Sequence, residues 1–387
     1  MKKAAGALLA VCFSVALFAQ DGQDGQDGQD RLPTREEEND VFSLHFGIYD
    51  QTDGDDNAGG NPFIDEEETV YEAIIVVDKQ VSERDRMKVR FLGDLVSSAS
   101  ITRETNPMFQ ALQSNPSGNE RGELTVGWTR DFRDYSLGGH GSIGGELSNY
   151  VSLGWGLNLG VPLPNGNTRL RLDYLGSLDL FEVKLFNGLE PGRDERLTST
   201  LEGGLTHVLT PRTVVDLAAN LTHQTGFLAT TWHSVFVNGF EISENVPDTR
   251  WRRSITSRIK YSLGEDNAVE LGYRFYDDSW DIRSHTYELT FSQYLFDRRL
   301  LLEPNYRYYD QRGASFYDTS FLRPLEFMSS DPDLGGFDGR SAGLKATFIE
   351  PGWWPGRKAD ISLSFDYYTR SDGIDLWWAI FGYTRRY

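Results

Sequence analysis

The sequence predicts an all-β protein folded as a closed antiparallel transmembrane β-barrel of about 16 strands. Three observations support this prediction. Apolar residues alternate with small or polar ones along segments of about 10–14 residues, the length that a tilted strand needs to cross a bilayer. Short connections alternate with other, often longer ones. The 387 residues also include 39 glycines, 23 phenylalanines, 18 tyrosines and 9 tryptophans, far too many aromatic residues for a disordered acidic chain.

The segment before the barrel reads as a targeting sequence followed by a leader. Lys2 and Lys3 precede a continuous apolar run that ends at Ala19, so residues 1–19 are predicted to be a secretory signal peptide. Its removal takes away Cys12, the one cysteine, so neither disulfides nor thiolate chemistry are expected in the mature chain. Residues 20–40, which include Asp-Gly-Gln repeats, are predicted to be a flexible acidic leader, and residues 41–387 to be the barrel.

The predicted strands show a period of two. Between Val151 and Val161 every odd position is apolar, whereas the even positions are serine, asparagine or glycine. The segments that begin at Val269 and Ile361 repeat this pattern against charged and small residues. Each segment therefore has one apolar face for lipid and one small or polar face for the barrel interior.

The connections give the strand count. Seven short turns are expected at 82–85, 131–134, 164–167, 209–212, 264–267, 296–299 and 351–357. Eight other connections are expected at 50–68, 99–119, 145–148, 182–197, 226–249, 279–284, 312–337 and 370–375. Strict alternation of the two kinds predicts 16 strands with short periplasmic turns and longer external loops. Residues 231–238 fit either a further strand or part of a folded loop, so 14 or 18 strands remain compatible.

Composition and the C-terminal residues predict the location of the protein and its partners. A net charge of −20 argues against nucleic acid as a partner, because phosphate contacts need clustered Lys and Arg. The aromatic alternation from Trp377 to the terminal Tyr387 is typical of the signal read by the barrel-assembly machinery, although Arg385 puts a charge in that pattern. We therefore expect the cell outer membrane, with its lipid and lipopolysaccharide, as the location, and a periplasmic or lipoprotein partner as a further interaction.

Several motifs resemble a known family. They are Asp-Leu-Val-Ser-Ser-Ala-Ser at 94–100, Asn-Val-Pro-Asp-Thr-Arg at 245–250, Tyr-Arg-Phe-Tyr-Asp-Asp-Ser-Trp at 273–280 with Ser-His-Thr at 284–286, and Tyr-Arg-Tyr-Tyr at 306–309 with Phe-Tyr at 316–317. They are similar to motifs of the domain-of-unknown-function 3570 family, although Ser98 stands where glycine is expected. The resemblance implies an outer-membrane barrel without an assigned activity. It also implies gene neighbours that include a small lipoprotein and flavin-transfer proteins, hence an envelope redox system.

The predicted topology gathers these motifs at the external rim. A ligand or partner site is one interpretation; the other is that the same side chains hold the loops by hydrogen bonds and ion pairs. The candidate residues are Asp248, Arg250, Asp277, Asp278, Asp281, His285, Arg307 and Tyr317.

Below the rim, the positions assigned to the lumen carry charges of both signs. A barrel of about 16 strands is wide enough for water, so these side chains can set a transverse field that selects small polar solutes. The alternative is that opposite charges pair and brace the wall. The candidate pore-lining residues are Arg90, Arg171, Arg252, Arg258, Lys260, Glu270, Arg274 and Glu288.

These observations favour a porin-like channel for small polar solutes over two other functions. One is a non-conducting anchor or sheath for an envelope complex, with a redox complex as one case. The other is a hydrolase in which His285 and a rim aspartate form a catalytic base, but one histidine in an aspartate-rich turn is weak evidence, and we expect no enzyme. No cofactor is expected, and the six histidines lack metal-ligand spacing.

Overall fold

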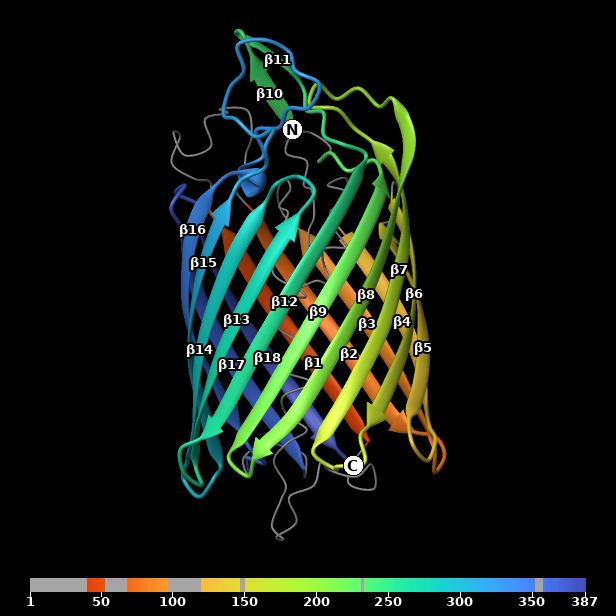
Figure 1. The fold of residues 1–387 in the computed structure, drawn as a ribbon, viewed down its shortest axis with the longest axis vertical. Helices are drawn as coiled ribbons and strands as arrows, with labels where there is room; N and C mark the ends of the chain where they lie inside the picture. The colour runs from red at the N-terminus through yellow and green to blue at the C-terminus, as the bar shows by residue number, and fades with distance from the viewer. Residues whose placement is uncertain (1–39, 53–67, 97–119, 147–149, 231–232, 352–357) are drawn as a thin grey trace.

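The computed structural model describes residues 40–52, 68–96, 120–146, 150–230, 233–351 and 358–387. They form a closed antiparallel barrel of 16 strands, so the predicted architecture and its strand count are confirmed (Figure 1). Strand neighbours in the barrel are neighbours in sequence except that β9 pairs with β12. The barrel closes where β1 pairs with β18, from Val41 opposite Arg386 to Gln51 opposite Leu376.

The strands make up most of the described chain. They are longer than the turns that join them at one end of the barrel. Their bounds are β1 Val41–Gln51, β2 Glu68–Gln80, β3 Asp85–Val96, β4 Glu120–Asp131, β5 Ser136–Glu146, β6 Tyr150–Pro162, β7 Thr168–Val183, β8 Gly192–Thr210, β9 Thr213–Gly226, β10 Ser234–Val237, β11 Phe240–Ser243, β12 Thr249–Ser262, β13 Asn267–Asp278, β14 Arg283–Leu295, β15 Leu300–Arg312, β16 Phe337–Phe348, β17 Ala359–Arg370 and β18 Asp375–Arg386, with a short 3-10 helix, η2, at Pro332–Leu334.

The two ends of the barrel differ as the sequence predicts. The short turns between β2 and β3, and likewise after β4, β6, β8, β12, β14 and β16, all lie at the end where β18 finishes. The long connections β9–β12 and β15–β16 lie at the other end, where the β10–β11 hairpin projects from the barrel (Figure 1), together with the short β13–β14 and β17–β18 turns. The predicted signal peptide, 1–19, and the predicted leader up to residue 39 lie outside the described residues.

One predicted connection is wrong in extent. Residues 182–197 read as a loop, yet β7 continues to Val183 and β8 begins at Gly192, paired without interruption. The charged residues of this segment look like a loop in the sequence. They belong to strands that continue beyond the apolar band, where outward side chains meet water. Strand β8 therefore has 19 residues, more than the predicted length.

Apolar side chains cover the outside of the barrel because the strand period alternates the two faces. On β7, Leu170, Leu172 and Tyr174 are all more than a third exposed, whereas the alternate positions Arg171 and Asp173 form an ion pair on the inner face. Glycines on the inner wall make room for larger neighbours: a methyl group on Gly156 would collide with the ring of His140. Among the described residues no helix is long and apolar enough to cross a membrane.

A cap lies over the end that carries the long loops. We use this name for residues 227–230 and 233–248, which contain β10 and β11, and residues 313–336, which contain η2. Backbone bonds join the two segments, since Asn245 and Met328 exchange N–H···O bonds of 3.0 and 2.8 Å. Of the segment 231–238, left open by the sequence, residues 233–238 form part of this folded loop and add no barrel strand, and the first two residues lie outside the described chain.

Candidate functional site

A buried arginine holds the turn between β13 and β14. The Arg250 guanidinium on β12 donates to Asp278 Oδ2 from Nε at 2.8 Å and from Nη2 at 2.5 Å. It also lies over the Trp280 ring, 4.2 Å from the centroid. The other carboxylate oxygen of Asp278 accepts the backbone N–H groups of Trp280 and Ile282 at 2.9 and 3.0 Å. Both oxygens of Asp278 are thus occupied within the protein.

The Arg250–Asp278 ion pair, which we call the Arg250 clamp, packs against an apolar cluster that joins the barrel to the cap. The cluster combines residues of the β13–β14 turn and of both cap segments: Val246, Tyr276, Trp280, Ile282, Ala314 and Leu334. Tyr276 adds a hydroxyl bond of 2.8 Å to Asp278 Oδ2. Tyr317 packs at the edge of this cluster, where burial raises the pKa of its hydroxyl to about 12. Arg250, Asp278 and Tyr317 therefore lie in one neighbourhood, and their contacts support the loop-holding interpretation.

A second polar group lies inside the cap. His233 Nδ1 is 3.4 Å from Asp331 Oδ2, and Glu244 accepts the Thr230 N–H at 2.5 Å and the Ser329 hydroxyl at 2.7 Å. His233, Glu244 and Asp331 are all buried. Burial raises the pKa of Glu244 to about 7, and the nearby Asp331 carboxylate acts in the same direction while His233 opposes it. Burial alone would raise the pKa of Asp331, but His233, the Asp333 N–H and Arg370 together outweigh burial and hold that pKa below its usual value.

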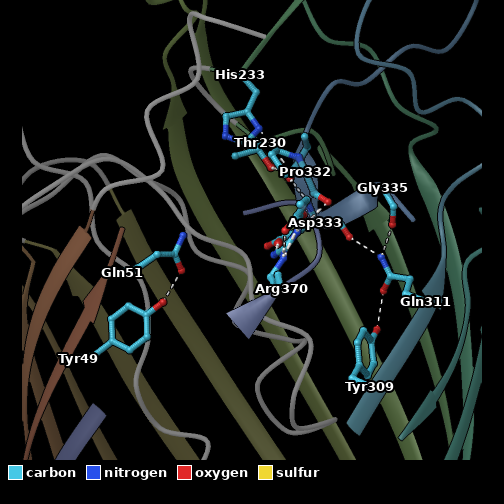
Figure 2. A network of polar contacts seen from close by, with 12 residues as sticks. Tyr49, Gln51, Thr230, His233, Tyr309, Gln311, Pro332, Asp333, Gly335 and Arg370 are labelled. Atoms are coloured by element: carbon cyan, nitrogen blue, oxygen red, sulfur yellow. Dashed lines mark hydrogen bonds and ion pairs between the residues drawn. The ribbon is translucent and has the colours of Figure 1, made fainter. Parts of the chain in front are cut away.

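Two inward-facing side chains attach η2 to the inner edge of the rim. Arg370 at the end of β17 contacts Asp333 Oδ1 at 2.5 Å and the Pro332 carbonyl at 3.1 Å, and its guanidinium stacks 3.7 Å from the Phe337 ring centroid. The Gln311 amide on β15 donates to the carbonyls of Asp333 and Gly335 at 2.8 and 2.7 Å. Figure 2 shows both side chains directed toward this segment. The cap is therefore fixed on the inner side of the rim.

The structure separates Asp277 and His285 from the other predicted rim residues. Both lie on outward positions of β13 and β14, since Asp277 contacts the exposed Arg253 and Arg283. His285 Nδ1 lies 2.9 Å from the Tyr273 hydroxyl, and its ring packs beside Phe275. His285 and Asp278 thus face opposite sides of the wall and are not brought together.

The remaining rim candidates also lie apart. Asp248 and Asp281 are exposed, Asp281 in the β13–β14 turn with a φ of 69°. Arg307 points inward from the middle of β15, 3.9 Å from Glu288, with its guanidinium 5.8 Å from the Tyr309 ring. The motif 94–100 is described only up to Val96, and its later residues lie outside the described chain.

The eight predicted pore-lining residues occupy inward positions, as the pairing register and alternation place them. Several form ion pairs across strands. Arg90 lies 3.6 Å from Glu123, Arg258 lies 3.6 Å from Glu288, and Arg171 contacts both Asp173 and Glu202. Lys260 is directly opposite Glu270, Arg274 stacks on Tyr276, and Arg252 is buried. Both sequence interpretations fit this wall, because paired charges brace it and still present a transverse field.

One part of the inner wall departs from the predicted small or polar lining. Val70, Ile74 and Val76 on β2 and Leu92 on β3 face inward and are almost entirely buried. Except for the buried Glu72 on its inner face, the middle of strand β2 is apolar on both faces, since Tyr71 and Ile75 on its outer face are exposed. The inner wall is therefore charged on some strands and apolar on others. Among the described residues no group of three or more histidine, cysteine or acidic side chains is arranged to hold a metal ion.

A comparison with protein families identifies the family of this chain. Residues 167–384, more than half of the chain, match the model described as Protein of unknown function (DUF3570). The chain belongs to this family. The matched region spans β7 nearly to the end of β18 and includes the Arg250 clamp, the whole cap and Arg370. The resemblance predicted from the motifs at 245–250, 273–280 and 306–309 is confirmed. No curated protein matches the chain significantly.

Solved structures share the fold of this DUF3570 member at low identity. A structure described as "Bacterial polysaccharide outer membrane secretin" is 9% identical with a TM-score of 0.51, covering 89% of this chain and 98% of that one. The siderophore receptor PirA from Acinetobacter baumannii is 11% identical with a TM-score of 0.46 over 86% of this chain. This chain spans 53% of that receptor. OccK8 (OprE) from Pseudomonas aeruginosa is 9% identical with a TM-score of 0.38, over 90% and 98% of the two chains.

Sequence reasoning missed the polar groups of the cap. Glu244 and Ser329 are 85 positions apart, and Arg370 and Asp333 are 37 positions apart, so no local spacing joins them. A weak signal was present in the length and composition of 312–337, which carries three aspartates and two prolines within a single connection. A loop of this length more often adopts a defined structure than remains without one.

Proposed function

We propose that this DUF3570 barrel is an outer-membrane channel for small polar solutes. The observation that supports it most is the charged inner wall of a 16-strand barrel, where Arg171 on β7, Arg258 on β12 and Glu288 on β14 face inward. Barrels of about 16 strands are wide enough for an aqueous channel. Side chains of both signs then act on passing solutes through a transverse field.

The proposed orientation puts the short turns in the periplasm and the cap outside the cell. This is the arrangement of outer-membrane barrels, in which periplasmic turns are short and external loops are long. The signal peptide, the location in the outer membrane and insertion by the barrel-assembly machinery through the strand ending at Tyr387 belong to the same proposal. So does contact of the apolar outer face with outer-membrane lipid and lipopolysaccharide.

A specific observation favours the alternative of a non-conducting anchor or sheath for an envelope complex. Val70 and Leu92 face inward yet have no exposed surface. Apolar surface is stabilised by removal from water, so this part of the inner wall suits a filled rather than an open lumen. A periplasmic or lipoprotein partner, including a redox partner, belongs to this alternative.

We propose that the barrel is not an enzyme. His285 faces outward beside Tyr273 and Phe275, away from Asp278. The other histidine near carboxylates, His233, is buried in the cap with Glu244 and Asp331. Neither arrangement offers an accessible base beside a space for substrate, the geometry that general-base catalysis needs.

Liposome swelling with neutral solutes of graded size tests the channel. The purified folded barrel should admit small sugars and exclude large ones, and the rate should change when Glu288→Gln and Arg258→Gln alter the inner wall. The matched control is Arg298→Gln, which removes an exposed ion pair with Asp266 on a short turn. Absence of swelling for every solute, with folding intact, would support the anchor or sheath instead.

A further inference from the structure

The outer face of the barrel carries a row of arginines at the cap end of β12 to β15. Arg253 and Arg283 point outward with side-chain exposures of 72% and 55%. Arg312 follows on β15 at an exposed outward position. We call Arg253, Arg283 and Arg312 the outer arginine row. It lies on the opposite side of the wall from the Arg250 clamp and the charged lumen.

The row lies at a defined level of the membrane. Next to it on the same strands, toward the barrel middle, are outward tyrosines: Tyr273 and Tyr287 have ring centroids 5.2 Å apart, and Tyr287 and Tyr308 have centroids 6.4 Å apart. Outward aromatic residues form girdles at the headgroup level of transmembrane barrels. The outer arginine row therefore stands where the polar groups of the outer leaflet begin.

One carboxylate orients two of the arginines. Asp277 Oδ2 accepts from Arg253 Nε at 2.7 Å and Nη2 at 2.5 Å, whereas Asp277 Oδ1 accepts from Arg283 Nε at 3.3 Å and Nη2 at 3.2 Å. The two guanidinium groups flank this carboxylate. The group formed by this one carboxylate and the two guanidinium ions therefore has a net positive charge.

The third arginine lies opposite another arginine, with the exposed Asp310 two positions away on the same outer face of β15. Arg312 is directly opposite Arg283 in the β14–β15 pairing, and both side chains point outward. Like charges at directly opposite positions destabilise a sheet. Among the residues that the structure describes, no carboxylate lies within ion-pair distance of Arg312. An anion placed between these two side chains would relieve the repulsion.

We propose that the outer arginine row binds the phosphate groups of the phosphorylated glycolipid of the outer leaflet. Guanidinium groups recognise phosphate by paired, charge-assisted hydrogen bonds, and arginine suits that geometry better than lysine. The acyl chains of the same lipid would lie against the tyrosines and the apolar band below. The site rests on the proposed orientation of the barrel, and it adds a lipid-binding function that is independent of solute passage.

Binding of lipid A to the purified folded barrel in detergent tests the proposal. The probes are bisphosphorylated lipid A and the same molecule with both phosphates removed. The wild type should bind the phosphorylated form, and the variant Arg253→Gln/Arg283→Gln/Arg312→Gln should lose about tenfold or more in affinity. Arg298→Gln, at an exposed arginine on the opposite end, should bind as the wild type does.

Two results would overturn the proposal: equal affinity of the triple variant and the wild type, or equal affinity for lipid A with and without phosphates. The second result would mean that the acyl chains alone are bound. A separate measurement checks orientation: a thiol label should reach Leu322→Cys, 93% exposed in the cap, in intact cells. Failure of that label would reject the orientation, and failure of lipid binding would reject the site.

Discussion

Two arginine–aspartate pairs on the same two strands illustrate how the barrel wall separates roles. Arg250 with Asp278 and Arg253 with Asp277 join β12 to β13 with equally short contacts of 2.5 Å. The inner pair has side-chain exposures of 1% and 0%. In the outer pair, Arg253 is 72% exposed. Neighbouring aspartates thus face opposite sides of one strand and meet different surroundings.

The difference lies in what else each carboxylate contacts. Asp278 accepts two guanidinium nitrogens, the Tyr276 hydroxyl and two backbone N–H groups, so it has no capacity left for a ligand. Asp277 is shared between two arginines whose outer surfaces face the membrane boundary. We infer that the inner pair holds the fold and that the outer pair orients a surface for binding.

The largest expected effect is on the inner pair. Asp278→Asn should lower the free energy of unfolding by about 3–5 kcal/mol, because it leaves the buried Arg250 charge without its partner. Denaturant unfolding in lipid vesicles measures this. The matched control is Asp281→Asn, which removes an equal charge from an exposed position in the adjoining turn. A loss as small for Asp278→Asn as for the control would contradict the structural role.

A second inner contact extends the comparison. Arg370→Met should release the segment around Asp333 at a cost of about 2–3 kcal/mol, because hydrogen bonds to charged groups are lost at a largely buried side chain. Hydrogen exchange of residues 332–335 should rise, and single-channel current should become noisier. Arg84→Met, at an exposed position in a short turn, should change neither measurement.

The cap has a pH dependence of its own that centres on Glu244. Burial raises the pKa of Glu244 to about 7, so the folded cap holds a proton that the unfolded chain releases near pH 4.5. The stabilisation from that proton is complete below the ordinary carboxyl pKa and is lost as pH rises through about 7. Asp331, with its pKa lowered, acts oppositely: its contribution is present above the ordinary value and is lost in acid.

Hydrogen exchange of residues 313–336, corrected for the intrinsic pH dependence, should therefore increase between about pH 4.5 and pH 7. Glu244→Gln should flatten this increase because the amide does not titrate. The same variant should leave exchange in β17 unaltered. An equal pH dependence in the variant and the wild type would show that Glu244 does not control the cap.

The smallest effect on stability is expected for the outer pair. Asp277→Asn should change the free energy of unfolding by less than about 1 kcal/mol, because both arginine partners of Asp277 are largely exposed and ion pairs with exposed partners contribute little. It should nevertheless alter lipid A affinity, since the two guanidinium groups lose their common orienting partner. A large loss of stability would place Asp277 in the same structural class as Asp278 and remove the contrast between the pairs.

Most of the barrel was predictable because its signals are local. Alternation along Val151–Val161 identifies β6, and turn residues such as Asn165 and Gly166 mark its end. The same alternation implies that Asp277 and Asp278 face opposite sides, although both were assigned to one rim site. Grouping them by sequence proximity was therefore the weakest step, since a strand reverses its side at every residue.

The cap and the apolar inner wall were less predictable for different reasons. Contacts such as Glu244 with Ser329 depend on how two loops fold together, which no periodicity reports. The apolar lining was visible in the run Ile74 to Val77, which has no polar face. A continuous apolar run indicates a strand buried on both sides, and such a run does not show which side faces the lumen.

Single-channel recording of the purified barrel in a planar bilayer tests the proposed channel most directly. The barrel should show steady open steps and a non-zero reversal potential in a KCl gradient. Glu288→Gln should shift this reversal potential, because Glu288 faces the lumen between Arg258 and Arg307. A folded barrel that inserts but shows no conductance would contradict the channel and favour the non-conducting anchor or sheath.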